Sequence, residues 1–132
     1  MATIKSHLEA AQDLTVITLT GHLTARELLE ASAAFYAGRP TRLSLWDFAE
    51  VTTADVETDD LMRLARQIKA FIERRKQGRT AIVKSKHINV GVIKMFRGMA
   101  ALEGLPYDYR IFRTRTEARR WLGVKRVADG MS

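Results

Sequence analysis

The chain opens with two runs in which apolar and polar residues alternate, the period of a β-strand with one buried face. These runs are residues 3–10 and 14–20, and both are rich in Thr, Val, Ile and Leu. Gln12 and Asp13 lie between them and supply residues that favour a tight turn. The sequence therefore predicts an N-terminal β-hairpin.

Beyond residue 24, four segments carry apolar residues three or four positions apart, as in an amphipathic helix. The expected helices are residues 25–37, 58–77, 88–103 and 115–122. Two of them begin with a Thr-x-x-Glu capping box, Thr24 with Glu27 and Thr114 with Glu117. Short β-like segments alternate with the helices, and we expect three further strands at residues 42–47, 80–84 and 106–112.

The resulting order β-β-α-β-α-β-α-β-α predicts an α/β fold with a five-stranded, mostly parallel sheet. Leu43 and Leu45 alternate with more polar neighbours, whereas a strand covered on both faces is usually a continuous apolar run. We therefore expect helices chiefly on one face, with all four stacked there. Trp46 would lie on the less covered face, under the hairpin or available to a partner. One domain over residues 1–122 and a flexible C-terminal tail over residues 123–132 are expected.

The chain has no cysteine, which excludes a disulfide scaffold, a thiol nucleophile and a cysteine-based zinc site. Its histidines, His7, His22 and His87, lack the spacing of metal ligands. Neither a nucleophile elbow nor a phosphate-binding loop is present. We therefore predict no enzymatic activity, no catalytic residue, no metal and no cofactor.

Charge is unevenly distributed along the chain. Residues 1–60 contain 4 basic and 10 acidic side chains, and residues 61–132 contain 18 basic and 5 acidic ones. The basic clusters lack interleaved aromatic residues and any nucleic-acid-binding signature, so we do not expect specific nucleic-acid binding. An anionic membrane surface or an acidic protein is the favoured alternative. No apolar stretch approaches the ~20 residues of a membrane span and no export signal is seen, which predicts a cytoplasmic protein.

Polar residues are expected at the carboxyl ends of the parallel strands, where α/β proteins commonly bind ligands. They are His22, Asp47, residues 84–87 and Arg113. A hydrolase or transferase that uses Asp47 or Ser85 is a weaker hypothesis. We favour structural roles, with Asp47 bonded to backbone N–H groups, Ser85 as the N-cap of the third helix, and His87 on the surface.

The third helix carries more apolar surface than one buried stripe requires. We expect its core stripe to contain Ile88, Val92, Met95, Phe96 and Met99, with Val90, Ile93 and Ala101 outside it. Gly91 and Gly98 lie seven residues apart on one side, and each costs about 1 kcal/mol relative to alanine in a helix. Close approach of another helix or subunit would account for them, and a homodimer is expected. A small apolar molecule or lipid bound by this helix and the loop after Asp47 is the alternative.

Two segments resemble a known family. The strand L-S-L-W-D-F at residues 43–48 is followed by an acidic, Thr-rich stretch and a long helix, and residues 112–122 read F-R-T-R-T-E-A-R-R-W-L. With the element order, these features are similar to the SpoIIAA-like group of the STAS superfamily, bacterial domains of this size, over residues 14–122. The resemblance implies a regulatory, non-enzymatic module that binds proteins. In the best-known members, anti-sigma-factor antagonists, phosphorylation of a serine at the helix after the third strand controls binding to a kinase.

The sequence lacks the serine of this phosphorylation site. Asp55 matches the family aspartate, but Val56 stands where the serine would be and no glycine follows. Thr58 is expected to be an N-cap, because Glu57 and Asp59 would repel a phosphate beside them. We therefore expect no phosphoserine switch. The predicted ligand or partner contacts are Trp46, Asp47, Thr52, Asp55, Thr58, Ser85, Gly91, Ile93, Met95 and Gly98.

Overall fold

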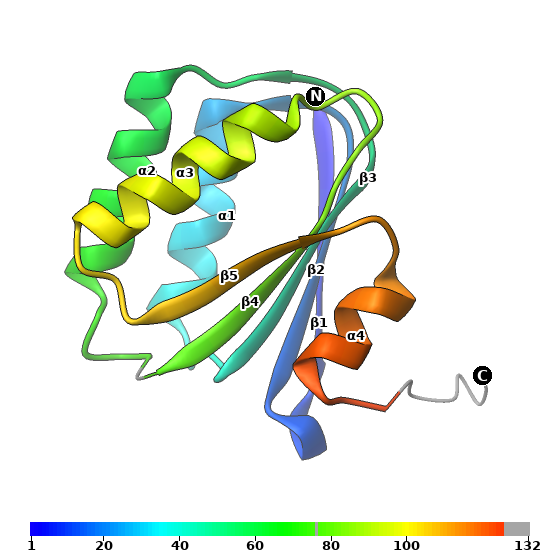
Figure 1. Cartoon of the computed structure of the whole chain (residues 1–132), viewed down its shortest axis with the longest axis vertical. Coiled ribbons are helices and arrows are strands. Elements are labelled where there is room, and N and C mark those ends of the chain that lie inside the picture. Colours follow the sequence, from blue (N-terminus) through cyan, green and yellow to red (C-terminus); the bar gives the residue numbers. More distant parts are fainter. Residues whose placement is uncertain (76, 126–132) are drawn as a thin grey trace.

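The computed structural model describes residues 1–75 and 77–125, which form a five-stranded sheet and four α-helices (Figure 1). The strands are β1 (Ala2–Glu9), β2 (Leu14–Thr24), β3 (Leu43–Asp55), β4 (Gly78–Val83) and β5 (Tyr107–Phe112). The helices are α1 (Ala25–Ala37), α2 (Thr58–Ala70), α3 (Val90–Leu102) and α4 (Arg115–Leu122). The strands lie side by side in chain order, with β1 antiparallel to β2 and all other pairs parallel. The predicted fold class and element order are confirmed.

The N-terminal hairpin closes through a short 3-10 turn at Ala10–Gln12 and a left-handed Asp13, with φ of 52°. Asp tolerates this conformation better than most residues. The capping box at α1 is also present, because Thr24 Oγ1 accepts from the Glu27 N–H and Glu27 accepts from the Thr24 N–H. Local sequence signals therefore fix both ends of β2.

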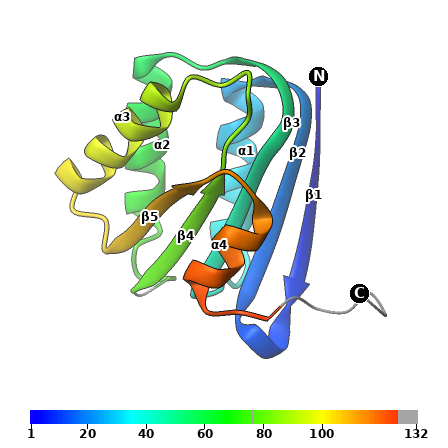
Figure 2. The same ribbon diagram turned by 45° about the vertical axis from the view of Figure 1, so that its right-hand side comes forward.

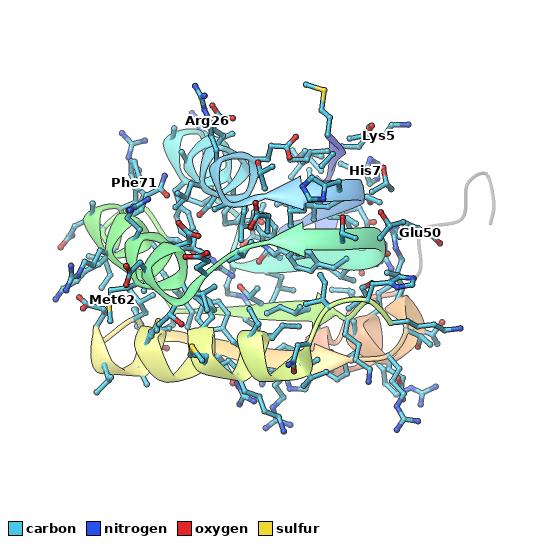
Figure 3. The ribbon with its side chains drawn as sticks, turned by 90° about the horizontal axis from the view of Figure 1, so that it is seen from above. Lys5, His7, Arg26, Glu50, Met62 and Phe71 are labelled. Atoms are coloured by element: carbon cyan, nitrogen blue, oxygen red, sulfur yellow. The ribbon has the colours of Figure 1, made fainter. Side chains whose placement is uncertain are left out.

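Three of the four helices cover one face of the sheet, and α4 covers the other (Figures 1 and 2). The face under α4 is formed by Leu14, Val16, Leu43, Leu45, Ala81 and Val83, which pack against Ala118 and Leu122. Seen from above, Lys5 and His7 of β1 and Glu50 of β3 lie on the side of the sheet away from α1 to α3 (Figure 3). The expectation that all four helices share one face was wrong, although most of them do.

The alternation in β3 has a different cause from the one expected. Leu43 and Leu45 are buried under α4, while Ser44 is buried on the opposite face, where its hydroxyl hydrogen-bonds Thr80 Oγ1 at 2.8 Å. A polar residue in this strand is thus compatible with burial because its hydroxyl has a partner. Trp46 also faces the three-helix layer, is only 8% exposed and meets the Phe35 ring edge to face at 6.2 Å. It does not lie on the less covered face, contrary to the sequence-based prediction.

Strand β3 is longer than expected, since residues 48–55 continue it instead of forming a loop. This second half pairs with residues 20–24 of β2, with one register shift before Thr20 and another between Gly21 and His22. Val51 is fully buried, and β-branched Val51, Thr52 and Thr53 favour extended backbone. The region compared with the family's switch loop is therefore part of the sheet.

Two helices differ from their predicted limits. Helix α2 ends at Ala70 and not at residue 77, because residues 71–74 form turns that direct Arg75 into the core. Helix α3 begins at Val90, after Asn89, whose side chain accepts from the Gly91 N–H at 2.8 Å. Asn89 is thus the N-cap of α3, a role that we had assigned to Ser85.

Helix α4 is fixed to the sheet by two ion pairs. Arg119 contacts both carboxylate oxygens of Glu9, at 3.1 and 2.5 Å, and Arg115 contacts Asp47 at 2.5 Å. Beyond α4, the backbone N–H of Lys125 donates to Gln12 at 2.7 Å, so residues 123–125 return to the hairpin. Residues 126–132 of the expected tail lie outside the described residues. In the part of the chain described, no helix is long and apolar enough to cross a membrane.

The Glu9–Arg119 pair predicts a defined loss of stability in acid. The hydrogen bond from Arg119 lowers the pKa of Glu9 below its ordinary value of 4.5. This contribution is complete above pH 4.5 and disappears as the pH falls through the folded-state pKa. Glu9→Gln should therefore be about 1–2 kcal/mol less stable than wild type at pH 7, and this difference should shrink below pH ~4.5.

Urea denaturation of both proteins between pH 3 and 7 measures the effect. Glu27, whose pKa is also lowered, mainly by the Ala2 and Thr24 N–H groups, titrates in both proteins, so only the difference reports on Glu9. A difference that stays constant across this range would contradict the assignment.

Candidate functional site

An apolar cavity of about 110 Å³ lies between the sheet and the layer formed by α1, α2 and α3. Its lining comes from every element of that layer and from β2 to β5. The apolar lining residues include Leu23, Leu28, Trp46, Phe48, Val56, Leu61, Leu64, Ile68, Ile82, Ile88, Val92, Ile93 and Phe96. The helices and the sheet therefore enclose a space that their side chains do not fill.

The mouth of the cavity lies at the carboxyl end of β3 and the starts of α2 and α3. Ala54 is exposed there, and Val56, Ile88 and Val92 are half-buried. Val56, at the position compared with the family's phosphorylated serine, has its side chain in the cavity lining. Trp46 and Ile93, both predicted as contacts, also line the cavity, so the structure brings these three residues together.

Four hydroxyl-bearing residues line the same cavity, namely Ser32, Tyr36, Thr80 and Tyr109. Tyr109 is 7% exposed, and among the residues that the structure describes its hydroxyl lies near that of Tyr36 but makes no hydrogen bond of normal geometry. Burial raises the pKa of Tyr109 well above its ordinary value of 10.0, and the neighbouring Tyr36 adds to the shift. The hydroxyl therefore stays protonated and has a proton to donate.

Arg75 lies behind these hydroxyl groups and is 2% exposed. Its guanidinium donates to the carbonyl oxygens of Thr41, Arg42 and Arg79 and to the hydroxyls of Tyr36 and Thr80, at 2.9–3.1 Å. It also stacks on the Tyr107 ring, 4.6 Å from the centroid. Within residues 1–75 and 77–125 no carboxylate forms an ion pair with it. A buried cation thus lies next to the polar end of the cavity.

Outside the cavity, α3 presents an exposed stripe of small and apolar residues, which we call the α3 stripe. It consists of Gly91, Met95, Gly98 and Leu102, spaced four, three and four residues apart. Met95 is 44% and Leu102 84% exposed. A Cβ on Gly98 would meet no atom of the described residues within 4 Å. The expected close approach to these glycines is therefore not made by another element of the fold among the described residues.

The predicted core stripe of α3 was right for Phe96 and Met99, which are buried, and wrong for Met95. The buried residues are Ile93, Phe96, Met99 and Ala100, whereas Met95 points to solvent. Ile93, predicted to lie off the core, is 8% exposed and packs in it. Leu102 was missed, although its spacing from Gly98 and Met95 could have identified it.

Thr58 and Met95 lie next to each other, with the Thr58 hydroxyl 3.6 Å from the Met95 sulfur. Thr58 is the first residue of α2 and not its N-cap, since Glu57 occupies that position and its N–H donates to Asp60 at 2.8 Å. The acidic start of α2 therefore lies beside the α3 stripe. Thr52 and Asp55 are exposed on the outer half of β3.

Asp47 and Ser85 have structural partners. Asp47 accepts from the Ala49 N–H at 2.9 Å, as expected, and also pairs with Arg115, which the sequence did not indicate. The Ser85 hydroxyl donates to the Val51 carbonyl at 2.6 Å and accepts from the His87 N–H at 2.9 Å. These contacts agree with structural roles for both side chains.

A second hollow, of about 430 Å³, lies between α3 and the end of β5. Five basic residues line it, Lys84, Lys94, Arg97, Arg110 and Arg113, together with Val90, Ile111 and Phe112. Other members of the basic clusters are used internally, because Arg75 is buried and Arg115 and Arg119 are paired with carboxylates. In the described ranges no three His, Asp or Glu side chains are grouped to hold a metal ion.

Comparison with known proteins identifies the architecture. No protein-family model matches the sequence, and no curated protein matches it. Among solved structures, an anti-sigma factor antagonist from Mycobacterium paratuberculosis matches 94% of this chain over 96% of its own, with 14% identity and a TM-score of 0.61. An uncharacterized protein with a SpoIIAA-like fold from Shewanella loihica matches 92% over 93%, with 16% identity and a TM-score of 0.53. SpoIIAA in its unphosphorylated form matches 92% over 100%, with the same identity and TM-score.

At these identities the likeness concerns the fold, and it agrees with the resemblance seen in the sequence. By its architecture, this chain has a SpoIIAA-like fold.

Proposed function

We propose that this chain is a non-enzymatic, regulatory protein-interaction module of the cytoplasm that binds its partner through the α3 stripe. The observation that carries the proposal is the exposure of Met95, Gly98 and Leu102 on one side of a helix in a SpoIIAA-like fold. Glycine at an exposed helical position costs about 1 kcal/mol relative to alanine. Since no atom within residues 1–75 and 77–125 lies near a Cβ at Gly98, close contact with a second molecule would explain why glycine is used here.

The charges beside the stripe favour a second copy of the chain as the partner. Glu57 and Asp59 at the start of α2 lie on one side, near the Thr58–Met95 contact. Lys94 and Arg97 of α3 line the basic hollow on the other side. A two-fold axis parallel to α3 would place the acidic side of one copy over the basic side of the other. Self-association therefore needs no further component.

The module would work without the family's phosphoserine switch. Val56 cannot accept a phosphate, and its side chain contributes to an apolar cavity. A phosphate on neighbouring Thr58 would face Glu57, Asp59 and Asp60, which disfavours a second negative charge there. Any regulation of this module would therefore not use phosphorylation at position 56 or 58.

Sedimentation equilibrium at micromolar concentration tests the proposal. We expect the wild type to be a dimer and Met95→Lys to be a monomer, because a charge in the centre of the stripe would be desolvated at the interface. Leu8→Lys on β1 is the matched control, since Leu8 is also exposed, at 59%, but lies on the opposite edge of the sheet. It should dimerise like the wild type.

A monomeric wild type would show that the partner is not a second copy. The tagged protein and both variants would then be used to capture proteins from cells that produce the chain. A protein retained by the wild type and Leu8→Lys, but lost with Met95→Lys, would be the partner. If no protein follows this pattern, the stripe is not a binding surface.

A second candidate function, binding of a small apolar molecule, is favoured by the cavity of about 110 Å³. It can coexist with a protein-binding role, because the cavity and the α3 stripe occupy opposite sides of α3.

A further inference from the structure

The cavity differs from an ordinary packing defect in its chemistry. Protein interiors contain few voids larger than a water molecule, and purely apolar cavities of about 150 Å³ are known to bind benzene. The present cavity, at about 110 Å³, is of similar scale and is lined at its mouth by residues that are only half-buried. A molecule bound inside could therefore extend toward solvent between Val56 and Val92.

The hydroxyl of Tyr109 gives one end of the cavity a hydrogen-bond donor. It belongs to a residue that lines the cavity, is more than nine-tenths buried and lacks a hydrogen-bond partner among the described residues. A buried hydroxyl without a partner costs ~1–3 kcal/mol, which a ligand oxygen could recover. Tyr107 offers a contrast, because its hydroxyl donates to the Arg75 carbonyl at 2.6 Å and it is not part of the lining.

The surrounding groups select a hydrogen-bond acceptor. Tyr36 and Thr80, which line the same cavity, both accept hydrogen bonds from the buried guanidinium of Arg75. A buried positive charge without a carboxylate partner favours electron-rich atoms nearby. The Tyr109 hydroxyl, kept protonated by its raised pKa, can donate to such an atom.

We infer that the cavity is a binding site for a small, mainly apolar molecule with one oxygen acceptor, about the size of a monosubstituted benzene, held by the Tyr109 hydroxyl. The apolar body would lie among Trp46, Ile82 and Phe96, and the oxygen would lie at the end formed by Tyr109. This inference rests on the second candidate function, the binding of a small apolar molecule, and does not depend on the association proposed for the α3 stripe. Substitutions of Tyr109 and of the residues at the mouth can test the hydrogen bond and access to the cavity independently.

Titration with benzene and phenol, followed by amide chemical shifts in ¹H–¹⁵N NMR spectra, tests the inference. We expect both probes to bind to the wild type, and phenol to bind about five- to tenfold more tightly because of one additional hydrogen bond. Tyr109→Phe should lose the preference for phenol, because the phenol hydroxyl would then be buried without this partner. Tyr107→Phe, the matched control, should keep the preference for phenol.

A variant with a filled cavity provides the remaining control. Val56→Phe places additional volume at the mouth and should abolish binding of both probes. If neither probe binds to the wild type, or if Val56→Phe binds both unchanged, the cavity is not a ligand site. If Tyr109→Phe keeps the preference for phenol, the assignment of the polar end is wrong. Tyr109→Phe removes a buried hydroxyl without a partner and is expected to fold.

Discussion

Replacing Arg75 with methionine is expected to lower the free energy of unfolding by about 3–5 kcal/mol. The aliphatic part of the side chain would be retained, but five hydrogen-bond acceptors would each lose one donor. Two of them keep another partner, since the Arg42 carbonyl also accepts from the Arg79 N–H and the Thr80 hydroxyl also bonds Ser44. Three of these are the carbonyl oxygens of Thr41, Arg42 and Arg79, which lie at the ends of neighbouring segments. The free energy lost by burying polar groups with fewer partners exceeds the free energy gained by burying the methionine side chain. Urea denaturation followed by circular dichroism measures the change.

Arg74 provides a matched control in the neighbouring position. It is exposed and donates one hydrogen bond, to the Ala37 carbonyl at 3.0 Å. Arg74→Met should therefore change the stability by about 0.5 kcal/mol or less. Arg75→Lys should be nearly as unstable as Arg75→Met, because an ammonium group cannot replace the planar fork of the guanidinium. Similar stabilities for the variants at positions 74 and 75 would contradict the buried network.

Arg75 illustrates what the sequence could not reveal about the site. In the chain it stands between Arg74 and a further lysine, where three basic residues agree well with the end of a long helix. Arg75 points into the core because α2 ends at Ala70, five residues before it. The inward position depends on tertiary contacts of Arg75 with Tyr36 and Tyr107. The cavity's polar end was missed for the same reason, because no local pattern marks Tyr109 as lacking a partner.

The element order, by contrast, could be predicted because its signals are local. Alternation identified the hairpin, helical spacing identified the four helices, and the Thr24–Glu27 box located the start of α1. The position of α4 could not be predicted in this way. Leu43 and Leu45 are buried under α4 on one face of the sheet. The opposite face looked exposed in the sequence because it carries the polar residues Ser44 and Thr80, which are buried and hydrogen-bonded to each other.

The outer half of β3 was not predicted. The strand was expected to end at Asp47, and the acidic, Thr-rich residues after it were interpreted as a loop. In the structure they pair with β2, and the buried Val51 anchors them. The signal was available in the β-branched residues 51–53, which favour a strand.

The phase of α3 was ambiguous because apolar residues surround most of the helix. The predicted stripe contained Ile88, Val92, Met95, Phe96 and Met99, and a stripe through Ile93, Phe96 and Ala100 fits the sequence about equally well. The structure buries the second stripe, and with it Met99 of the first. The difference decides which substitutions probe the surface and which probe the core.

Ile93→Lys is therefore expected to lower the free energy of unfolding by about 3–5 kcal/mol. Ile93 is 8% exposed, lines the cavity and packs in the main core, where a lysine ammonium group would have neither water nor a carboxylate partner. The long side chain could reach solvent through the mouth only by displacing Val92 or Ile88, which would disturb the packing. Urea denaturation at a protein concentration low enough to keep the chain monomeric measures this effect.

Met95→Lys, two residues further along the same helix, is the control. Met95 lies on the exposed α3 stripe, and lysine has nearly the same helix propensity as methionine. Its stability should therefore remain within about 0.5 kcal/mol of the wild type. The ratio of the two effects reports directly on the rotation of α3 about its axis. If Met95→Lys were the more destabilising of the two, the helix would bury the stripe that contains Met95, and both the cavity lining and the proposed partner surface would have to be reassigned.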